Sequence, residues 1–259
     1  MKKNILFIGY GDLGSRLASI GQEDLVITGI SRSLKPTIAP DQYHSLDWFN
    51  NPAQKVDLLK NYDCLVITLT PTSFDEAGYE KGYEEGMKLI SKLVKNISFK
   101  KSLLISSTRV YQDSGEPINE LSNINSEDFR AKSLLESEAI YSKGINSSQK
   151  TIFRLSGLYD PEMKDKIFYR QVDEFQNKLI PISANLNRLS RDQAARIIMN
   201  FCINKTDLLL LNVSEPTVLA QERFEILFPE KNFDDFFRID NPGKQLDISN
   251  LLKSKLLDG

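Results

Sequence analysis

The chain has 259 residues, enough for one large domain or for a core with a small additional lobe. Hydrophobic residues make up 41% and charged residues 26%, which is typical of globular proteins and excludes a disordered, collagen-like or disulfide-stapled chain. Lysine and arginine number 33 against 35 aspartate and glutamate, and the net charge of −2 gives no basic field for a nucleic acid. We therefore expect no nucleic-acid partner.

Neither a membrane span nor a secretory signal is expected. The N-terminal apolar run ILFIG is too short for a signal peptide, and no apolar stretch approaches the ~20 residues that cross a bilayer. Cys64 and Cys202 are far apart in the sequence, each in an apolar run, where a free cysteine behaves as a small hydrophobic residue. These features predict a cytoplasmic protein without a membrane partner.

Short apolar runs alternate with helical patterns over the first 160 residues, which is typical of repeated strand–helix–strand units. The expected strands are Asn4–Ile8, Leu25–Ile30, Cys64–Leu69, Ser102–Ser106 and Thr151–Leu155. Apolar residues at helical spacing between Tyr79 and Ile97, and again between Phe129 and Ile140, predict helices that cover the sheet. The predicted fold class is α/β, with a doubly wound parallel sheet.

The regular alternation weakens after Leu155. Ser190 and Gln193 have the spacing of a capping box, which predicts the start of a helix over Arg191–Asn204. The apolar run Leu208–Val213 then predicts one more buried strand.

Two parts are expected along the chain: residues 1–160 as a dinucleotide-binding core, and residues 161–259 completing that core and adding a small substrate lobe. The phenylalanine-rich segment Phe224–Phe237 and the amphipathic stretch Leu246–Leu257 would build this lobe. A cleft is then expected between the lobe and the edge of the sheet.

A glycine motif lies between the first expected strand and a helix that begins near Asp12. The sequence NILFIGYGDLGSRLA places Gly9, Gly11 and Gly14 in the order G-x-G-x-x-G. Gly9 allows a tight turn, Gly11 lets the backbone approach a pyrophosphate, and Gly14 allows close packing of helix and strand. The motif predicts a dinucleotide held at the helix N-terminus. The other residues of the motif, Tyr10, Asp12 and Leu13, are also expected to lie near the cofactor.

The end of the second strand decides between the two nicotinamide cofactors. This segment reads VITGISRSLK, with Ser31, Arg32 and Lys35 and without an acid before Asp41. A guanidinium bonds a 2′-phosphate more strongly than a neutral group does, so NADP is favoured over NAD. The alternative is that Arg32 is only a solvated surface residue.

Later motifs resemble the short-chain dehydrogenase/reductase superfamily, in particular the extended and atypical branch that includes NAD-dependent epimerase/dehydratase proteins. The segments that carry the resemblance are ISSTRVYQ (105–112), RAKSLLESE, IFRLSGLYDP (152–161), LNRLSRDQAA and LNVSEP (211–216). Their order and spacing are more specific than any one of them. The resemblance implies a Rossmann fold with a nicotinamide cofactor.

The resemblance also implies roles for individual residues. Ser107 stands where the family has its catalytic serine or threonine, and Lys132 where it has the catalytic lysine, which also binds the cofactor. Further implied cofactor contacts come from Asp47, Leu69, Thr70 and Pro71. The implied substrate contacts are Tyr111, Arg188 and Asp192.

One position departs from the family pattern. The family's acid/base is a tyrosine four residues before the lysine, and here that residue is Asp128. A phenol titrates near ~10 and a carboxyl near ~4, so Asp128 could accept a proton but would donate one poorly. Three alternatives follow: the pKa of Asp128 is strongly raised in a closed cleft, Tyr111 or another group substitutes, or the proton chemistry is absent.

Several of these residues also have a purely structural explanation. Ser107 could serve only to satisfy backbone groups at a strand end, Lys132 could form a surface pair with Glu136, and Asp192 could be favoured by the helix dipole alone. His44 is the only histidine and is expected to be structural, so no metal site is expected.

The sequence therefore predicts an NADP-dependent oxidoreductase or epimerase/dehydratase-like enzyme. It would act on a hydroxyl or carbonyl of a small polar metabolite, with a nucleotide sugar as one candidate. The alternative is a catalytically silent NADP-binding sensor, because the family's tyrosine is replaced by Asp128. A homo-oligomer is compatible with the sequence.

Overall fold

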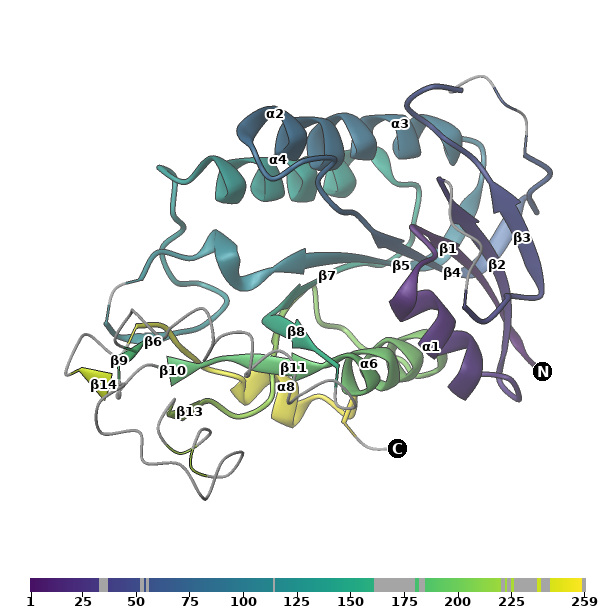
Figure 1. The fold of residues 1–259 in the computed structure, drawn as a ribbon. Helices are drawn as coiled ribbons and strands as arrows, with labels where there is room; N and C mark the ends of the chain where they lie inside the picture. Colours follow the sequence, from purple (N-terminus) through teal and green to yellow (C-terminus); the bar gives the residue numbers. More distant parts are fainter. Residues whose placement is uncertain are drawn as a thin grey trace.

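A seven-stranded parallel sheet forms the centre of the molecule, as seen in the computed structural model (Figure 1). The structure describes residues 1–32, 37–51, 54, 56–113, 115–160, 180–181, 185–219, 222, 225, 237–238 and 243–257. The strands of the sheet are β1 (Lys3–Ile8), β2 (Leu25–Ser31), β3 (Gln42–Ser45), β4 (Asn61–Thr68), β5 (Ser98–Ser107), β7 (Lys150–Leu155) and β12 (Leu210–Val213). Their order is β12-β7-β5-β4-β1-β2-β3, and all neighbouring strands are parallel.

The strand order reverses between β1 and β4. From β1 the chain builds β2 and β3 toward one edge, and then returns to build β4, β5, β7 and β12 toward the other. The helices that follow β1 and β4 leave on opposite faces, so a crevice opens at the carboxyl ends of these two strands. This topology confirms the predicted doubly wound α/β fold and places the crevice beside the glycine motif.

Helices cover both faces of the sheet (Figure 1). One face carries α1 (Asp12–Ile20) and α6 (Arg191–Ile203); the other carries α2 (Glu76–Tyr79), the π-helix η1 (Glu80–Glu85), α3 (Gly86–Leu93) and α4 (Phe129–Gly144). A short 3-10 turn, η2 (Thr108–Val110), follows β5. Within the described residues, no helix has both the length and the apolar character needed to cross a bilayer.

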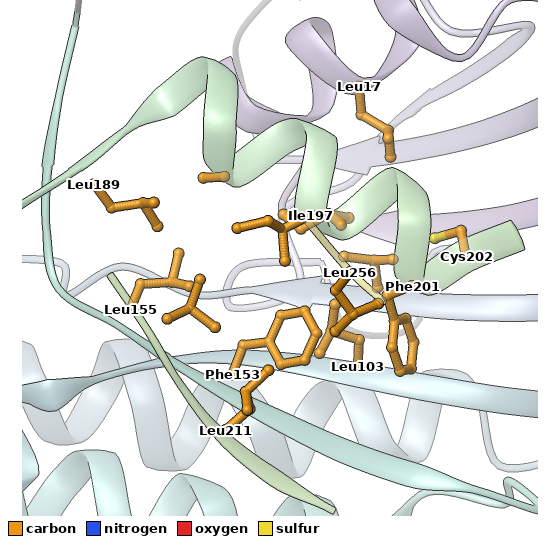
Figure 2. Packing of buried hydrophobic residues seen from close by; sticks show 14 of the residues in the cluster. Leu17, Leu103, Phe153, Leu155, Leu189, Ile197, Phe201, Cys202, Leu211 and Leu256 are labelled. Carbon is orange, nitrogen blue, oxygen red and sulfur yellow. The ribbon is translucent and has the colours of Figure 1, made fainter. Parts of the chain in front are cut away.

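The larger hydrophobic cluster lies between the sheet and α6 (Figure 2). Phe153 of β7 meets Phe201 of α6 edge to face, with ring centroids 5.4 Å apart. Both predicted hydrophobic cysteines are fully buried, and the sulfur atoms of Cys64 and Cys202 lie 3.7 Å apart across this interface. The long apolar runs of the sequence are therefore strands that are buried on both faces.

Each predicted strand is present, with ends that differ by a few residues. The sequence prediction missed β3, because its four residues QYHS are neither an apolar run nor an alternating one. The predicted helix cap at Ser190 is confirmed, since its hydroxyl accepts a hydrogen bond of 3.2 Å from the backbone N–H of Gln193.

Short strand pairs extend the structure beyond the carboxyl edge of the main sheet. They are formed by β6 (Pro117–Ile118) with β15 (Gln245–Leu246), β8 (Gly157–Tyr159) with β11 (Arg188–Ser190), β10 (Asn185–Leu186) with β13 (Val218–Leu219), and β9 (Ile180–Pro181) with β14 (Phe237–Arg238). A last helix, α8 (Ser249–Lys253), packs beside β12. The β8–β11 and β6–β15 pairs are both parallel.

The C-terminal stretch is part of the main core. Leu246, Ile248, Leu251 and Leu256 belong to the same buried cluster as the sheet, so this stretch does not stand apart as a lobe. The segment Phe224–Phe237, the other predicted part of the lobe, lies almost entirely outside the described residues.

Candidate functional site

A cavity of about 230 Å³ lies at the carboxyl ends of β1, β2 and β4, where the strand order reverses. It is lined by Gly9, Tyr10, Gly11, Ser31, Arg32, Trp48, Phe49, Thr68, Leu69, Thr70 and Gly82. The structure thus brings together the first glycines of the motif, the end of β2 and the segment that follows β4. These three segments were predicted to meet the cofactor.

Gly9 makes the tight turn that the motif predicts. Its φ of +84° is in the left-handed region, and a Cβ atom there would lie 1.9 Å from the carbonyl oxygen of Thr68. The Thr68 hydroxyl donates a 2.8 Å hydrogen bond to the Gly9 carbonyl and closes the turn against β4. Only glycine fits this position.

Gly11 is the N-cap of α1 and leaves the space before the helix N-terminus open. A Cβ atom on Gly11 would approach only the Gly9 carbonyl, at 3.8 Å, and no side chain in the described part of the chain caps the helix N-terminus. The nearest acid, Asp12, is turned to Arg16 at 3.1 Å. Uncapped N–H groups behind a glycine cradle fit the pyrophosphate of a dinucleotide.

Tyr10 is among the residues that line the cavity, and its side chain is anchored inside the protein. Its ring is fully buried, and its hydroxyl donates a 3.0 Å hydrogen bond to the carbonyl of Ile38. Burial raises the pKa of this phenol to about 12. A Cβ atom on Gly14 would lie 2.6 Å from the ring, and one on Gly29 would lie 2.8 Å from it. Gly14 therefore makes room for this ring.

Arg32 lies over an aromatic pair at the end of the cavity that adjoins β2. Its guanidinium carbon is 5.7 Å from the ring centroid of Trp48 and 5.4 Å from that of Phe49. It also approaches the Thr70 hydroxyl, at 3.4 Å. Ser31 is buried and hydrogen-bonded to the hydroxyl of Tyr43 at 2.7 Å. Of the two residues predicted to select the cofactor, Arg32 is therefore the more available.

Asp47 does not line the cavity but shapes its wall. Its carboxylate accepts hydrogen bonds from the backbone N–H groups of Phe49, at 3.1 Å, and Asn50, at 3.3 Å, which fixes the turn that carries the aromatic pair. Its pKa is lowered: slight burial would raise it, but the hydrogen bonds from Asn50 and Phe49 and the charge of Arg32 outweigh that effect. Asp47 is therefore an organiser of the turn.

Sequence reasoning missed the aromatic pair Trp48–Phe49 and the close approach of Gly82 to the Thr70 carbonyl. The signal for the pair was present, since both aromatic residues directly follow Asp47 in the sequence. Gly82 carried no local signal: a Cβ atom there would lie 2.4 Å from the Thr70 carbonyl, and this proximity exists only in the folded chain.

The predicted catalytic residues lie around the end of β5 and the start of α4. The Ser107 hydroxyl accepts a hydrogen bond of 3.2 Å from the N–H of Arg109. Asp128 is the N-cap of α4 and accepts from the N–H of Arg130 at 2.9 Å, with the guanidinium groups of Arg109 and Arg130 at 4.0 and 3.7 Å. Lys132, one turn later, is exposed. Asp128 thus has the contacts of a charged helix cap.

Tyr111 lies inside the protein, so the structure does not support its predicted contact with substrate. Its side chain is fully buried, and its hydroxyl donates a 2.7 Å hydrogen bond to the Asn212 side chain. Burial raises the pKa of this phenol, and Arg154, whose guanidinium carbon is 4.9 Å from the ring centroid, partly opposes the shift. A buried phenol with a committed hydroxyl cannot replace the missing acid/base.

Arg154 belongs to a buried ion pair that joins β7 to α4. It donates to the Glu138 carboxylate through Nε at 3.0 Å and Nη2 at 2.6 Å, and the Ser106 hydroxyl donates to the same carboxylate at 2.6 Å. Burial lowers the pKa of Arg154, but the hydrogen bonds and charge of Glu138 raise it further, so the net shift is upward. This pair fixes α4, and with it Asp128 and Lys132, over the sheet.

The two remaining predicted substrate residues have different surroundings. Asp192, in the first turn of α6, pairs with Arg16 of α1, which also bonds Asp160 at 2.8 Å. It therefore links two helices and is not free for a ligand. Arg188 is half-buried, its pKa is lowered by burial, and its guanidinium makes no ion pair with the described residues.

Fold and crevice together define a Rossmann-type protein whose glycine loop fits a dinucleotide. Among solved structures, a protein described as an NAD-dependent epimerase/dehydratase from Methylobacillus flagellatus is similar, with 23% identity, 97% of this chain and 91% of that chain covered, and a TM-score of 0.68. The NAD complex of UDP-glucuronic acid 4-epimerase from Bacillus cereus has 18% identity, coverages of 95% and 90%, and a TM-score of 0.73.

A third similar structure is UDP-N-acetylglucosamine 4-epimerase from Methanobrevibacter ruminantium, with 18% identity, coverages of 98% and 92%, and a TM-score of 0.72. No family model matches the sequence, and no curated protein matches it significantly. The predicted resemblance is confirmed at the level of the fold, which this chain shares with these epimerase and epimerase/dehydratase structures. At these identities the comparisons establish the fold alone.

Proposed function

We propose that the protein is a nicotinamide-dinucleotide-dependent enzyme of the epimerase/dehydratase type, acting on a hydroxyl or carbonyl of a small polar metabolite. The observation that carries the proposal is the glycine cradle: Gly9 turns the chain, Gly11 leaves the N-terminal end of α1 open, and none of the described side chains caps the helix. A bound nicotinamide would supply hydride transfer. The protein's residues would bind the cofactor, orient the substrate and move a proton.

A nucleotide sugar is the proposed substrate class. The similar structures include enzymes named for UDP-glucuronic acid and UDP-N-acetylglucosamine. In this chain, the guanidinium of Arg188 is half-buried and makes no ion pair with the residues that the structure describes, so it is a suitable anchor for a negative group of such a substrate. Ser107 and the exposed Lys132 would face the reacting hydroxyl and the nicotinamide ribose.

The alternative of a catalytically silent cofactor sensor gains no support, because the similar structures named for UDP-sugars are enzymes. A location in the cytoplasm and a homo-oligomeric state remain sequence-based proposals.

Replacement of Gly11 by valine tests the cradle. We expect the variant to fold normally, because a Cβ atom there approaches only one carbonyl, at 3.8 Å, but to lose detectable cofactor binding, because its side chain stands before the helix N-terminus. Fluorescence titration with NADH and NADPH measures the binding, and circular dichroism monitors the fold. A folded variant that binds with the parent affinity would contradict the assignment of this loop.

Arg32 is proposed to favour NADP, although similar structures contain NAD. We expect the parent protein to bind NADPH at least about tenfold more tightly than NADH, since a charge-assisted hydrogen bond contributes ~1.5–3 kcal/mol. Arg32→Glu should abolish or reverse this preference by placing a carboxylate where the 2′-phosphate would lie. Competition titrations decide the point; equal affinities in the parent would refute the role of Arg32 and leave NAD as the cofactor.

Turnover decides whether the site is catalytic. The protein would be incubated with NAD or NADP and a panel of nucleotide sugars, including UDP-glucuronic acid, and each product would be separated by chromatography. We expect at least one nucleotide sugar to be epimerised or oxidised. Cofactor binding without turnover on the panel would remove the proposed substrate class.

A further inference from the structure

The proposed chemistry at a hydroxyl or carbonyl needs a proton donor, and the residues predicted for that role do not provide one. Tyr111 is buried with its hydroxyl bonded to Asn212. Asp128 caps α4 as a hydrogen-bond acceptor, with the guanidinium groups of Arg109 and Arg130 at 4.0 and 3.7 Å. Lys132 would bind the hydroxyls of the nicotinamide ribose, but a lysine does not by itself replace the family's acid/base tyrosine.

Tyr83 is on the π-helix η1, which packs against α4, the helix that Asp128 caps and that carries Lys132. Its neighbour Gly82 lines the cofactor cavity and rests on the Thr70–Pro71 segment, where a Cβ atom would lie 2.4 Å from the Thr70 carbonyl. Its other neighbour, Glu84, accepts a 3.0 Å hydrogen bond from Ser133, the residue after Lys132. Tyr83 is therefore held between the proposed ribose segment and the N-terminal half of α4.

The hydroxyl of Tyr83 is available. The ring packs against Tyr79, with centroids 5.5 Å apart, and the side chain is half-buried, but its hydroxyl makes no hydrogen bond to the residues that the structure describes. Burial raises the pKa of the phenol to about 12, Tyr79 adds to the shift, and the charge of Arg109 opposes it. At neutral pH Tyr83 is therefore protonated and can donate.

Arg109 connects Tyr83 to the predicted catalytic residues. It lies two residues after Ser107, its guanidinium is 4.0 Å from Asp128, and its charge acts on the phenol of Tyr83. A cation beside a phenol stabilises the phenolate that remains after proton donation. The charge of Arg109 thus acts in the direction that a donating tyrosine needs, although burial outweighs it in the net shift of the Tyr83 pKa.

We propose that Tyr83 is the proton donor of this site and performs the role left vacant at Asp128. This rests on the proposed function. A bound reduced nicotinamide would supply a hydride to the substrate carbonyl carbon, and the C=O π pair would then move to oxygen. Tyr83 would break its O–H bond and give that oxygen the proton that completes the new hydroxyl. The Tyr83 phenolate would regain a proton from water, and the reverse sequence would serve oxidation of a hydroxyl.

The positive nicotinamide of NAD⁺ provides a test that needs no substrate. A positive charge within ~4–6 Å lowers the pKa of a phenol by ~1–3, so NAD⁺ should convert part of Tyr83 to phenolate at about pH 10.5, where the free protein keeps it protonated. The measurement is the ultraviolet tyrosinate difference spectrum on adding NAD⁺. NADH, whose nicotinamide is neutral, should produce a much smaller signal.

Two matched variants show whether the tyrosinate signal comes from Tyr83. Tyr83→Phe should abolish it, whereas Tyr79→Phe, which removes the neighbouring hydroxyl, should retain it; circular dichroism at the same pH shows that each variant is folded. Once the nucleotide-sugar panel has identified a substrate, Tyr83→Phe should lower kcat by a factor of roughly 10²–10⁴ with little change in cofactor affinity. A signal that persists in Tyr83→Phe, or NAD⁺ binding with no signal, overturns the role of Tyr83. Failure of every nicotinamide cofactor to bind instead overturns the proposed function.

Discussion

Replacing Arg154 by methionine should destabilise the protein by about 3–5 kcal/mol, because it leaves the Glu138 carboxylate buried without its cation. Both side chains are less than a tenth exposed, at 7% and 8%, and the guanidinium makes two hydrogen bonds to the carboxylate. Urea denaturation followed by circular dichroism measures the loss as a lower midpoint.

The matched control is the double variant Arg154→Met/Glu138→Leu. Removing both charges should restore much of the stability lost in the single variant, because an apolar pair of similar volume avoids the cost of an isolated buried charge. The recovery should be incomplete, since the Ser106 hydroxyl loses its acceptor. If the two single substitutions add without any recovery, the charges are not energetically coupled and this account of the pair is wrong.

Gly9→Ala should also cost roughly 2–6 kcal/mol of folding free energy. A positive φ strains a residue with a side chain by ~1–3 kcal/mol, and overpacking adds ~1–3 kcal/mol. Here the new Cβ atom would lie 1.9 Å from the Thr68 carbonyl oxygen, and this backbone atom cannot move aside as the end of a flexible side chain could. The expected result is a large fall in the urea midpoint, with cofactor binding lost as the turn distorts.

Gly11→Ala serves as the control for this effect, since it lies in the same loop but has open space around its Cβ position. We expect a loss of stability below about 1 kcal/mol, as for other exchanges at a helix N-cap. Equal destabilisation by both alanines would show that the loop responds to any side chain, and that the left-handed turn at Gly9 is not the decisive constraint.

The sheet could be predicted from the sequence because its central strands are buried on both faces and are therefore continuous apolar runs. The runs around Phe7, Val66 and Phe153 contain this pattern in a few neighbouring residues. The same reasoning failed for β3, an edge strand of mixed polarity. It also gave no account of the ion pair between Glu138 and Arg154, which depends on the packing of α4 over β7.

The cofactor side of the candidate site was predictable to a similar degree, and the catalytic side was not. Gly9 and Gly11 line the cavity as the motif predicts, because a strand–turn–helix arrangement is local in sequence. Tyr111 and Tyr83 could not be distinguished in that way. Their roles depend on which hydroxyl has a partner, and Asn212, the partner of Tyr111, is 101 residues away.

The burial of Tyr10 gives the glycine motif an additional meaning in this protein. The ring fills the space that Gly14 and Gly29 leave, so three positions, in the loop after β1, on α1 and on β2, share one fixed volume. A Cβ atom on Gly29 would also lie 2.9 Å from the Pro40 side chain. A larger residue at Gly29 would therefore need both a smaller residue at Tyr10 and a shift of Pro40, which makes substitutions at these positions mutually dependent. In this chain the third glycine of the motif and a glycine well outside it thus form one steric unit, and the identity of residue 10 determines how much freedom the other two positions have to vary.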